Sequence, residues 1–323
     1  MPAELDSMMY IGQVPWHRQG TKLNNPATAE QAVVAAGLDW GVQKQPIYTG
    51  PERNIQIKDR FAICRTDRLD QADGGQLGVV SSQYEPLQNR EAFSFLDPVV
   101  GADGAIYHTA GSLRGGRVTW MLAKLPGEIR VTHDDVAEKY ILLSNSHDGT
   151  AAVRIGLTPV RVVCMNTLNL ALCGMQGLTI RHYRDVAVRV KEAHRLLGIV
   201  NTAMDEAGVI MQRMATVQMT GHRQAEYFER VLPVPAENNP AWQKAVERHN
   251  RLEELFEVGD GNSLPGVSGT LWAAYNAVTQ WVDRESYTTR QKNPLTTIWF
   301  GEGARIKRLA FDVATEFASA GSN

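Results

Sequence analysis

One short polar loop of this sequence holds adjacent residues that could act together in chemistry. It runs Ser146, His147, Asp148, Gly149, Thr150 between two stretches rich in apolar residues. His147 and Asp148 could form a proton-transfer pair or supply two metal ligands. Successive side chains of a strand point to opposite faces, however, so the pair would not converge on one ion. The other interpretation is a hairpin turn, because Asp-Gly is a favoured turn pair and serine side chains bond to turn backbone.

Arginines placed at predicted turns and strand ends are the second candidate. Gly115 and Gly116 can take the positive φ angles of a tight hairpin turn, and Arg114 and Arg117 flank them. Arginines in such positions could follow the phosphates of a nucleic acid, while an aromatic ring stacks on a base. The predicted contacts are Arg114, Arg117, Arg154, Arg161, Arg181 and Arg184 for phosphate, and Trp120 or Tyr183 for stacking. The alternative for each arginine is a surface position paired with a nearby acid.

Other catalytic signatures are missing from the sequence. No two histidines have the His-x-x-x-His or His-Glu-x-x-His spacing, and the three cysteines form no Cys-x-x-Cys pair. There is no Gly-x-x-x-x-Gly-Lys-Ser/Thr phosphate loop and no Gly-x-Ser-x-Gly. We therefore expect no metal and no cofactor, with Cys64, Cys164 and Cys173 as buried thiols. The adjacent acids Asp134 and Asp135 are expected in a solvated turn.

The composition is that of an ordinary globular chain, with 323 residues, 43% of them hydrophobic and 21% charged, and a net charge of −2. Nucleic-acid-binding modules often carry an excess of Lys and Arg, so any such surface here must be local. No apolar run approaches the roughly 20 residues of a membrane-spanning helix, and the N-terminus lacks the pattern of a signal peptide. We expect a cytoplasmic protein with no membrane partner.

From Trp40 to about Leu170 the sequence predicts the strands of an antiparallel sheet. Runs of about four to eight β-branched and aromatic residues are broken there by Gly, Pro and Asp. The predicted strands are Gly41 to Tyr48, Phe61 to Arg65, Leu77 to Ser81, Ala105 to Leu113, Arg117 to Lys124, Lys139 to Ser144 and Ala151 to Cys164. Pro159 cannot donate to a strand ladder, so it must lie at an edge or a break. Asn89 can cap a helix that interrupts the series.

The segments on either side are predicted to be irregular or helical. Residues before Trp40 are expected to be mostly loop, with one helix at Thr28 to Ala36. Helical spacing of apolar residues predicts helices at Tyr183 to Met219, Gln224 to Leu232, Asn239 to Val258, Ser268 to Asp283 and Ala304 to Ala318. Ser268 is the expected cap of its helix. The fold class is α+β, a twisted antiparallel sheet with interrupting helices over residues 1–175, followed by a mostly α-helical region over residues 176–323.

Several ordered motifs resemble a known family. They are Pro15 to Thr21, Tyr84 to Asn89, Ser146 to Thr150 and Thr158 to Leu168, and the stretch Gly269 to Val278 is similar to the family's closing motif. This is the phage/plasmid-like family that carries a domain of unknown function and is found in prophages, phages and conjugative plasmids. The resemblance implies a protein that serves mobile-element DNA. Arg18, Gln19 and Gly20 depart from the Gly-Leu-Gly that relatives often show.

The predicted order of strands and helices also resembles the core of ring-forming single-strand annealing proteins of phage recombination. The leading hypothesis is a non-catalytic phage or plasmid DNA-binding protein that binds single-stranded DNA as a homo-oligomer, in a ring or filament. It would promote strand annealing in DNA recombination. Two alternatives stay open. One is a metal-dependent nuclease centred on His147 and Asp148, and the other is a protein that binds and inhibits a host factor.

Overall fold

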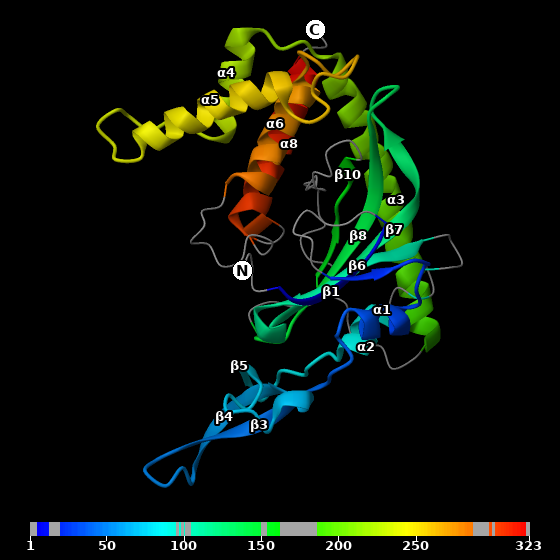
Figure 1. Ribbon diagram of the computed structural model, residues 1–323, viewed down its shortest axis with the longest axis vertical. Helices are drawn as coiled ribbons and strands as arrows, with labels where there is room; N and C mark the ends of the chain where they lie inside the picture. Colours follow the sequence, from blue (N-terminus) through cyan, green and yellow to red (C-terminus); the bar gives the residue numbers. More distant parts are fainter. Residues whose placement is uncertain are drawn as a thin grey trace. The chain divides into compact units, whose positions relative to one another are not determined.

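The computed structural model contains two sheets and a series of C-terminal helices (Figure 1). It describes residues 5–12, 20–94, 97, 100, 105–149, 154–161, 186–286, 297–298 and 301–320. Strands dominate before residue 161 and helices after residue 186, so the predicted α+β class is confirmed. Within these ranges, no helix is long and apolar enough to cross a bilayer.

The chain divides into two compact units, and each is discontinuous in sequence. The first unit comprises residues 1–126, 141–156 and 176–198, and the second comprises residues 127–140, 157–175 and 199–323. The predicted boundary at residue 175 lies outside the described residues. The division into residues 1–175 and 176–323 therefore stays a prediction.

The larger sheet has seven strands in the order β10-β8-β7-β6-β1-β2, with β9 also paired to β8. Its strands are β1 Leu5–Ile11, β2 Thr21–Leu23, β6 Ile106–Leu113, β7 Val118–Arg130, β8 Val136–Ser146, β9 Arg154–Leu157 and β10 Val160–Arg161. The pairs β1–β6, β6–β7 and β8–β10 are antiparallel, whereas β1–β2 is parallel, so this sheet is mixed. Pro159 lies between β9 and β10, at the predicted break.

The sequence predicts loop where β1 lies, and this prediction is wrong. β1 pairs with β2 on one side and with β6 on the other, and residues 8–10 are buried. Its sequence has few β-branched residues, so the strand depends on pairing and burial more than on local propensity. The pairing with β6 shifts register between Leu5 and Ser7, which makes Asp6 the extra residue of a bulge.

A smaller antiparallel sheet has the order β3-β4-β5. Its strands are β3 Val42–Thr49, β4 Ile55–Arg65 and β5 Gln76–Ser81. Ile63 and Val80 are buried, whereas residues 50–60 at the far end of the β3–β4 hairpin are mostly exposed. The three predicted strands are confirmed. β4 begins at Ile55 instead of Phe61, because pairing with Thr49 extends the hairpin.

Two short helices belong to the first unit, α1 (Ala29–Ala35) and α2 (Asn89–Ser94). A capping box begins α1: Thr28 Oγ1 accepts from the Gln31 N–H, and the Gln31 side chain accepts from the Thr28 N–H. The predicted helix at Thr28 is confirmed. Asn89 starts α2 but does not cap it, because its buried side chain bonds to the carbonyls of Leu38 and Trp40 instead.

Helices dominate the second unit. They are α3 Val186–Thr216, which enters this unit at residue 199, and α4 Gly221–Val231, α5 Trp242–Val258, α6 Leu271–Arg284 and α8 Glu302–Ala320. The five predicted helices are all present. α6 contacts α4, α5 and α8, and its Trp272 and Tyr275 are fully buried. The cap of α6 is Thr270 instead of Ser268, because Thr270 has the extended backbone of a cap and accepts from the Ala273 N–H.

Asp135 also differs from its prediction. Asp134 is half exposed in the β7–β8 turn, but Asp135 is fully buried. Asp135 Oδ2 accepts a hydrogen bond from Trp272 Nε1 at 2.7 Å. A buried indole N–H needs an acceptor, and this carboxylate supplies it across a separation in sequence that no local pattern reveals.

A buried ion pair in the second unit gives a first prediction. Lys307 is fully buried, and its Nζ lies 2.8 Å from Asp283 Oδ1. Lys307→Met removes the cation beside a largely buried carboxylate, so we predict a loss of about 3–5 kcal/mol in the free energy of unfolding, measured in urea. The double variant with Asp283→Leu should be more stable than Lys307→Met alone. If the losses in unfolding free energy of the two single variants add up to that of the double variant, Lys307 and Asp283 are not coupled.

Candidate nucleic-acid interface

The turn between β6 and β7 has a left-handed backbone over successive residues. Arg114, Gly115 and Gly116 have φ of 56°, 72° and 97°. The predicted positive φ angles of the two glycines are confirmed, and Arg114 extends the pattern by one residue. A Cβ at Gly116 would lie 2.9 Å from the Trp40 ring, so glycine is required there for space as well as for conformation.

Arg114 and Arg117 flank this turn but differ in their partners. Arg114 Nη2 lies 3.3 Å from Asp148 Oδ2, and the Arg114 side chain is 32% exposed. Arg117 is exposed, and no acid within the described ranges pairs with it. Arg114 thus fits the alternative of a paired arginine, whereas Arg117 is available to contact a phosphate.

His147 lies in the core of the first unit instead of on a reactive surface. Its ring is fully buried, with its centre 5.4 Å from that of Trp40. Its Nε2 lies 2.8 Å from Asn89 Oδ1. The Asn89 Nδ2 is the donor to two carbonyls, so Oδ1 is the acceptor and Nε2 carries the proton. Burial lowers the pKa of His147 to about 4, so the ring is neutral near pH 7.

The rest of the Ser-His-Asp-Gly-Thr loop makes contacts with β5 and with the segment that follows β5. Ser146 Oγ donates to Asp148 Oδ1 at 2.5 Å, and the Tyr84 hydroxyl donates to the Ser146 carbonyl at 3.1 Å. Gly78 of β5 lies so close to Asp148 that a Cβ would be 2.6 Å from its backbone. Over the described part of the chain, no cluster of His, Cys, Asp and Glu could hold a metal ion. The contacts fit the interpretation of this loop as a turn; Thr150 lies outside the described residues.

Arg65 is a buried arginine next to this turn that is not among the predicted contacts. Its guanidinium lies over Trp40, 4.1 Å from the ring centre, and donates to the Asp67 carboxylate at 3.0 and 2.8 Å. Its Nη1 also donates to the Gly115 carbonyl at 3.4 Å. The hydrogen bonds from Arg65 lower the pKa of Asp67. Its position at the end of a predicted strand is the same signal that marks the other arginines.

Of the remaining predicted contacts, only Trp120 has a described side chain. Trp120 is only 1% exposed inside the sheet, so its ring cannot stack on a base, and this prediction is wrong. The backbones of Arg154 and Arg161 lie in β9 and β10, next to β8, but their side chains are not described. Arg181, Tyr183 and Arg184 lie outside the described residues.

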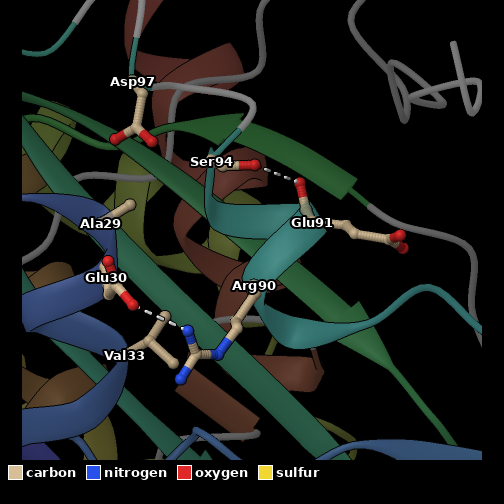
Figure 2. Close-up of a pocket in the computed structure, with 7 residues that line it drawn as sticks. All are labelled: Ala29, Glu30, Val33, Arg90, Glu91, Ser94 and Asp97. Carbon is tan, nitrogen blue, oxygen red and sulfur yellow. Dashed lines mark hydrogen bonds and ion pairs between the residues drawn. The ribbon is translucent and has the colours of Figure 1, made fainter. Parts of the chain in front are cut away.

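A pocket of about 340 Å³ lies beside α1 and α2 (Figure 2). Its lining residues are Ala29, Glu30, Val33, Arg90, Glu91, Ser94 and Asp97. Arg90 pairs with Glu30 at 2.9 Å, and Asp97 accepts from the Tyr107 hydroxyl at 2.9 Å. Figure 2 shows the Glu91 carboxylate directed away from Asp97. Carboxylates outnumber the single arginine, so this pocket is ill suited to a phosphate.

The buried His147 predicts a pH dependence of stability. The unfolded chain binds the proton with a pKa near 6.5 and the folded chain near 4, so the free energy of unfolding falls as the pH drops from 6.5 to 4. The loss from this group is roughly 3 kcal/mol. Urea unfolding across this range should show that loss in the wild type and in the exposed control His133→Gln, but not in His147→Gln. The same pH profile in His147→Gln would contradict the assignment.

The contact between β5 and the His147 loop predicts a steric effect. Gly78→Ala would force its Cβ against the Asp148 backbone, so we expect a loss of about 1–3 kcal/mol in unfolding free energy. Gly156→Ala is the matched control, because a Cβ there meets no atom of the described residues within 4 Å. Thermal unfolding compares the two variants. Equal stability would show that β5 and the loop are not in contact.

The β6–β7 turn and the His147 loop both fall within a match to a known domain. A family model described as "Domain of unknown function (DUF932)" matches residues 76–299, more than half of the chain. The match begins at β5 and extends beyond α6. No curated protein and no solved structure gives a significant match. The predicted resemblance to a family with a domain of unknown function is therefore confirmed at that level, and the chain belongs to the DUF932 family.

Proposed function

We propose that this protein is a phage- or plasmid-borne factor that binds single-stranded DNA as a homo-oligomer and promotes strand annealing. The observation that carries the proposal is Arg117, exposed beside the β6–β7 turn and without an acidic partner in the described ranges. Such an arginine can contact a phosphate without first breaking an ion pair. Arg154, Arg161, Arg181 and Arg184 remain predicted phosphate contacts, and Tyr183 remains the predicted stacking residue.

The order of elements gives the proposal further support. β6, β7 and β8 are successive neighbours in the larger sheet, and the 31-residue helix α3 is the next long helix in the described chain. A helix, α2, also follows the third predicted strand, β5, which is the feature on which the predicted resemblance to ring-forming single-strand annealing proteins rests. One fold can host many functions, so the analogy adds to the argument from Arg117 and does not replace it. Head-to-tail contacts between identical chains would give a ring or a filament.

The nuclease alternative has less support. The neutral His147 ring is fully buried, and the Asp148 carboxylate accepts from Ser146 and Arg114. Neither group is therefore placed to meet a substrate. No feature of the described residues favours an inhibitor of a host factor over DNA binding.

Replacement of Arg117 tests the proposed function. We predict that Arg117→Gln weakens binding of a labelled single-stranded oligonucleotide about threefold to tenfold, because one phosphate contact is lost. The slope of log affinity against log salt should shrink by about 0.7. Fluorescence anisotropy at several salt concentrations measures both, and a strand-annealing assay with complementary oligonucleotides measures activity.

Arg130→Gln is the matched control for this experiment. Arg130 is an exposed arginine that already pairs with Glu128, so its loss removes the same charge from a paired position. It should change the affinity less than twofold. If the wild-type protein does not bind the oligonucleotide at low salt, the proposed function is overturned. If the two variants have equal effects on affinity, Arg117 is not a specific phosphate contact.

A further inference from the structure

The backbone of the β6–β7 turn presents N–H donors to a single anionic group. Gly115 and Gly116 follow Arg114 with positive φ, and successive N–H groups of a turn can form an anion-binding concavity. The Gly116 N–H donates to Asp6 Oδ2 at 2.9 Å, and the Gly115 N–H also bonds to this carboxylate. Ser112 Oγ lies 3.5 Å from the same oxygen.

Asp6 reaches the turn because of the bulge in β1. Leu5 and Ser7 pair with consecutive residues of β6, which leaves Asp6 as the extra residue between them. A bulge redirects a side chain away from the regular alternation of a strand. Asp6 itself is exposed, unlike residues 8–10 further along β1. Its carboxylate can therefore leave the turn without opening the core.

Two arginines, Arg65 and Arg68, act electrostatically on the Asp6 carboxylate, and Arg114 and Arg117 flank the turn in the sequence. The pKa of Asp6 is nevertheless raised, because its desolvation outweighs the backbone N–H bonds and the two arginines.

We infer that the β6–β7 turn is a phosphate-binding site that the Asp6 carboxylate occupies when no ligand is bound. This inference rests on the proposed function in taking a nucleic-acid phosphate as the ligand. The incoming phosphate accepts from the Gly115 and Gly116 N–H groups in place of Asp6. Arg117 forms no ion pair with an acid of the described chain, so it can donate a charge-assisted hydrogen bond to the phosphate that it does not donate to Asp6.

The competition between Asp6 and phosphate has a directional test. Asp6→Asn keeps an oxygen that can accept from the turn but removes the charge that repels phosphate. We expect it to bind a labelled oligothymidylate about threefold to tenfold more tightly than the wild type at low salt. Glu52→Gln is the control, an exposed acid at the far end of the β3–β4 hairpin, and it should change the affinity less than twofold.

A site-specific signal keeps the test valid if Asp6→Asn alters the turn. We expect the amide resonances of Gly115 and Gly116 in the wild type to shift on titration with inorganic pyrophosphate, at lower concentration in Asp6→Asn. Affinity of Asp6→Asn equal to or weaker than that of Glu52→Gln, with no shift of these amides, would overturn the inference and assign Asp6 a purely structural role.

The two measurements separate this inference from the proposed function. Oligonucleotide binding without amide shifts and without an Asp6→Asn effect would leave the proposed function standing and remove the site from the turn. The opposite result is amide shifts that occur at lower pyrophosphate concentration in Asp6→Asn than in the wild type, without oligonucleotide binding. It would support the phosphate site and overturn DNA binding. Absence of both signals would overturn both.

Discussion

The buried hydrogen bond between Asn89 and His147 is the interaction on which the first unit depends. Asn89 lies at the start of α2, and its Nδ2 donates to the carbonyls of Leu38 and Trp40, just before β3. Its Oδ1 faces His147, which follows β8, and accepts from Thr119 of β7. One side chain thus joins four segments that are distant in sequence. Each buried polar group left without its partner costs about 1–3 kcal/mol. Displacing any one of the four segments would therefore leave a buried group unpaired and destabilise the unit.

That junction also fixes the β6–β7 turn. The His147 N–H donates to the Arg117 carbonyl at 2.8 Å, and the Asp148 carboxylate holds the Arg114 side chain. Asp6 contributes from β1 through its bond to the Gly116 N–H. Left-handed backbone is unfavourable for a residue such as Arg114 and persists only where the surroundings enforce it. The loop that resembles a catalytic motif therefore acts, in the described contacts, by holding the neighbouring turn in shape.

The features that were predictable from the sequence depend on residues close together in the chain. The helix that begins at Thr28 and the glycine turn depend on neighbouring residues, and the sequence predicts both. Trp120 was misjudged because β7 is buried on both faces over its first part, so strand alternation does not separate inside from outside. Asp135 and Asn89 were misjudged because their partners lie far away in sequence. The sequence around a polar residue at a helix start or in a turn does not show whether its hydrogen bonds are made to water or to a group that is distant in the chain.

A net charge of −2 does not decide whether such a surface can bind an anion. Charges on a protein surface are screened within about 10 Å, so the local balance matters more than the total. Around the β6–β7 turn, Arg65 and Arg114 are balanced by Asp67 and Asp148, which leaves Arg68, Arg117 and the backbone N–H groups as the attractive elements among the described residues. N–H groups held by the fold lose little further entropy when a ligand arrives, so even a few of them can contribute usefully to affinity. The contacts that force the turn into its strained conformation are thus the same contacts that prepare it to receive a negative charge.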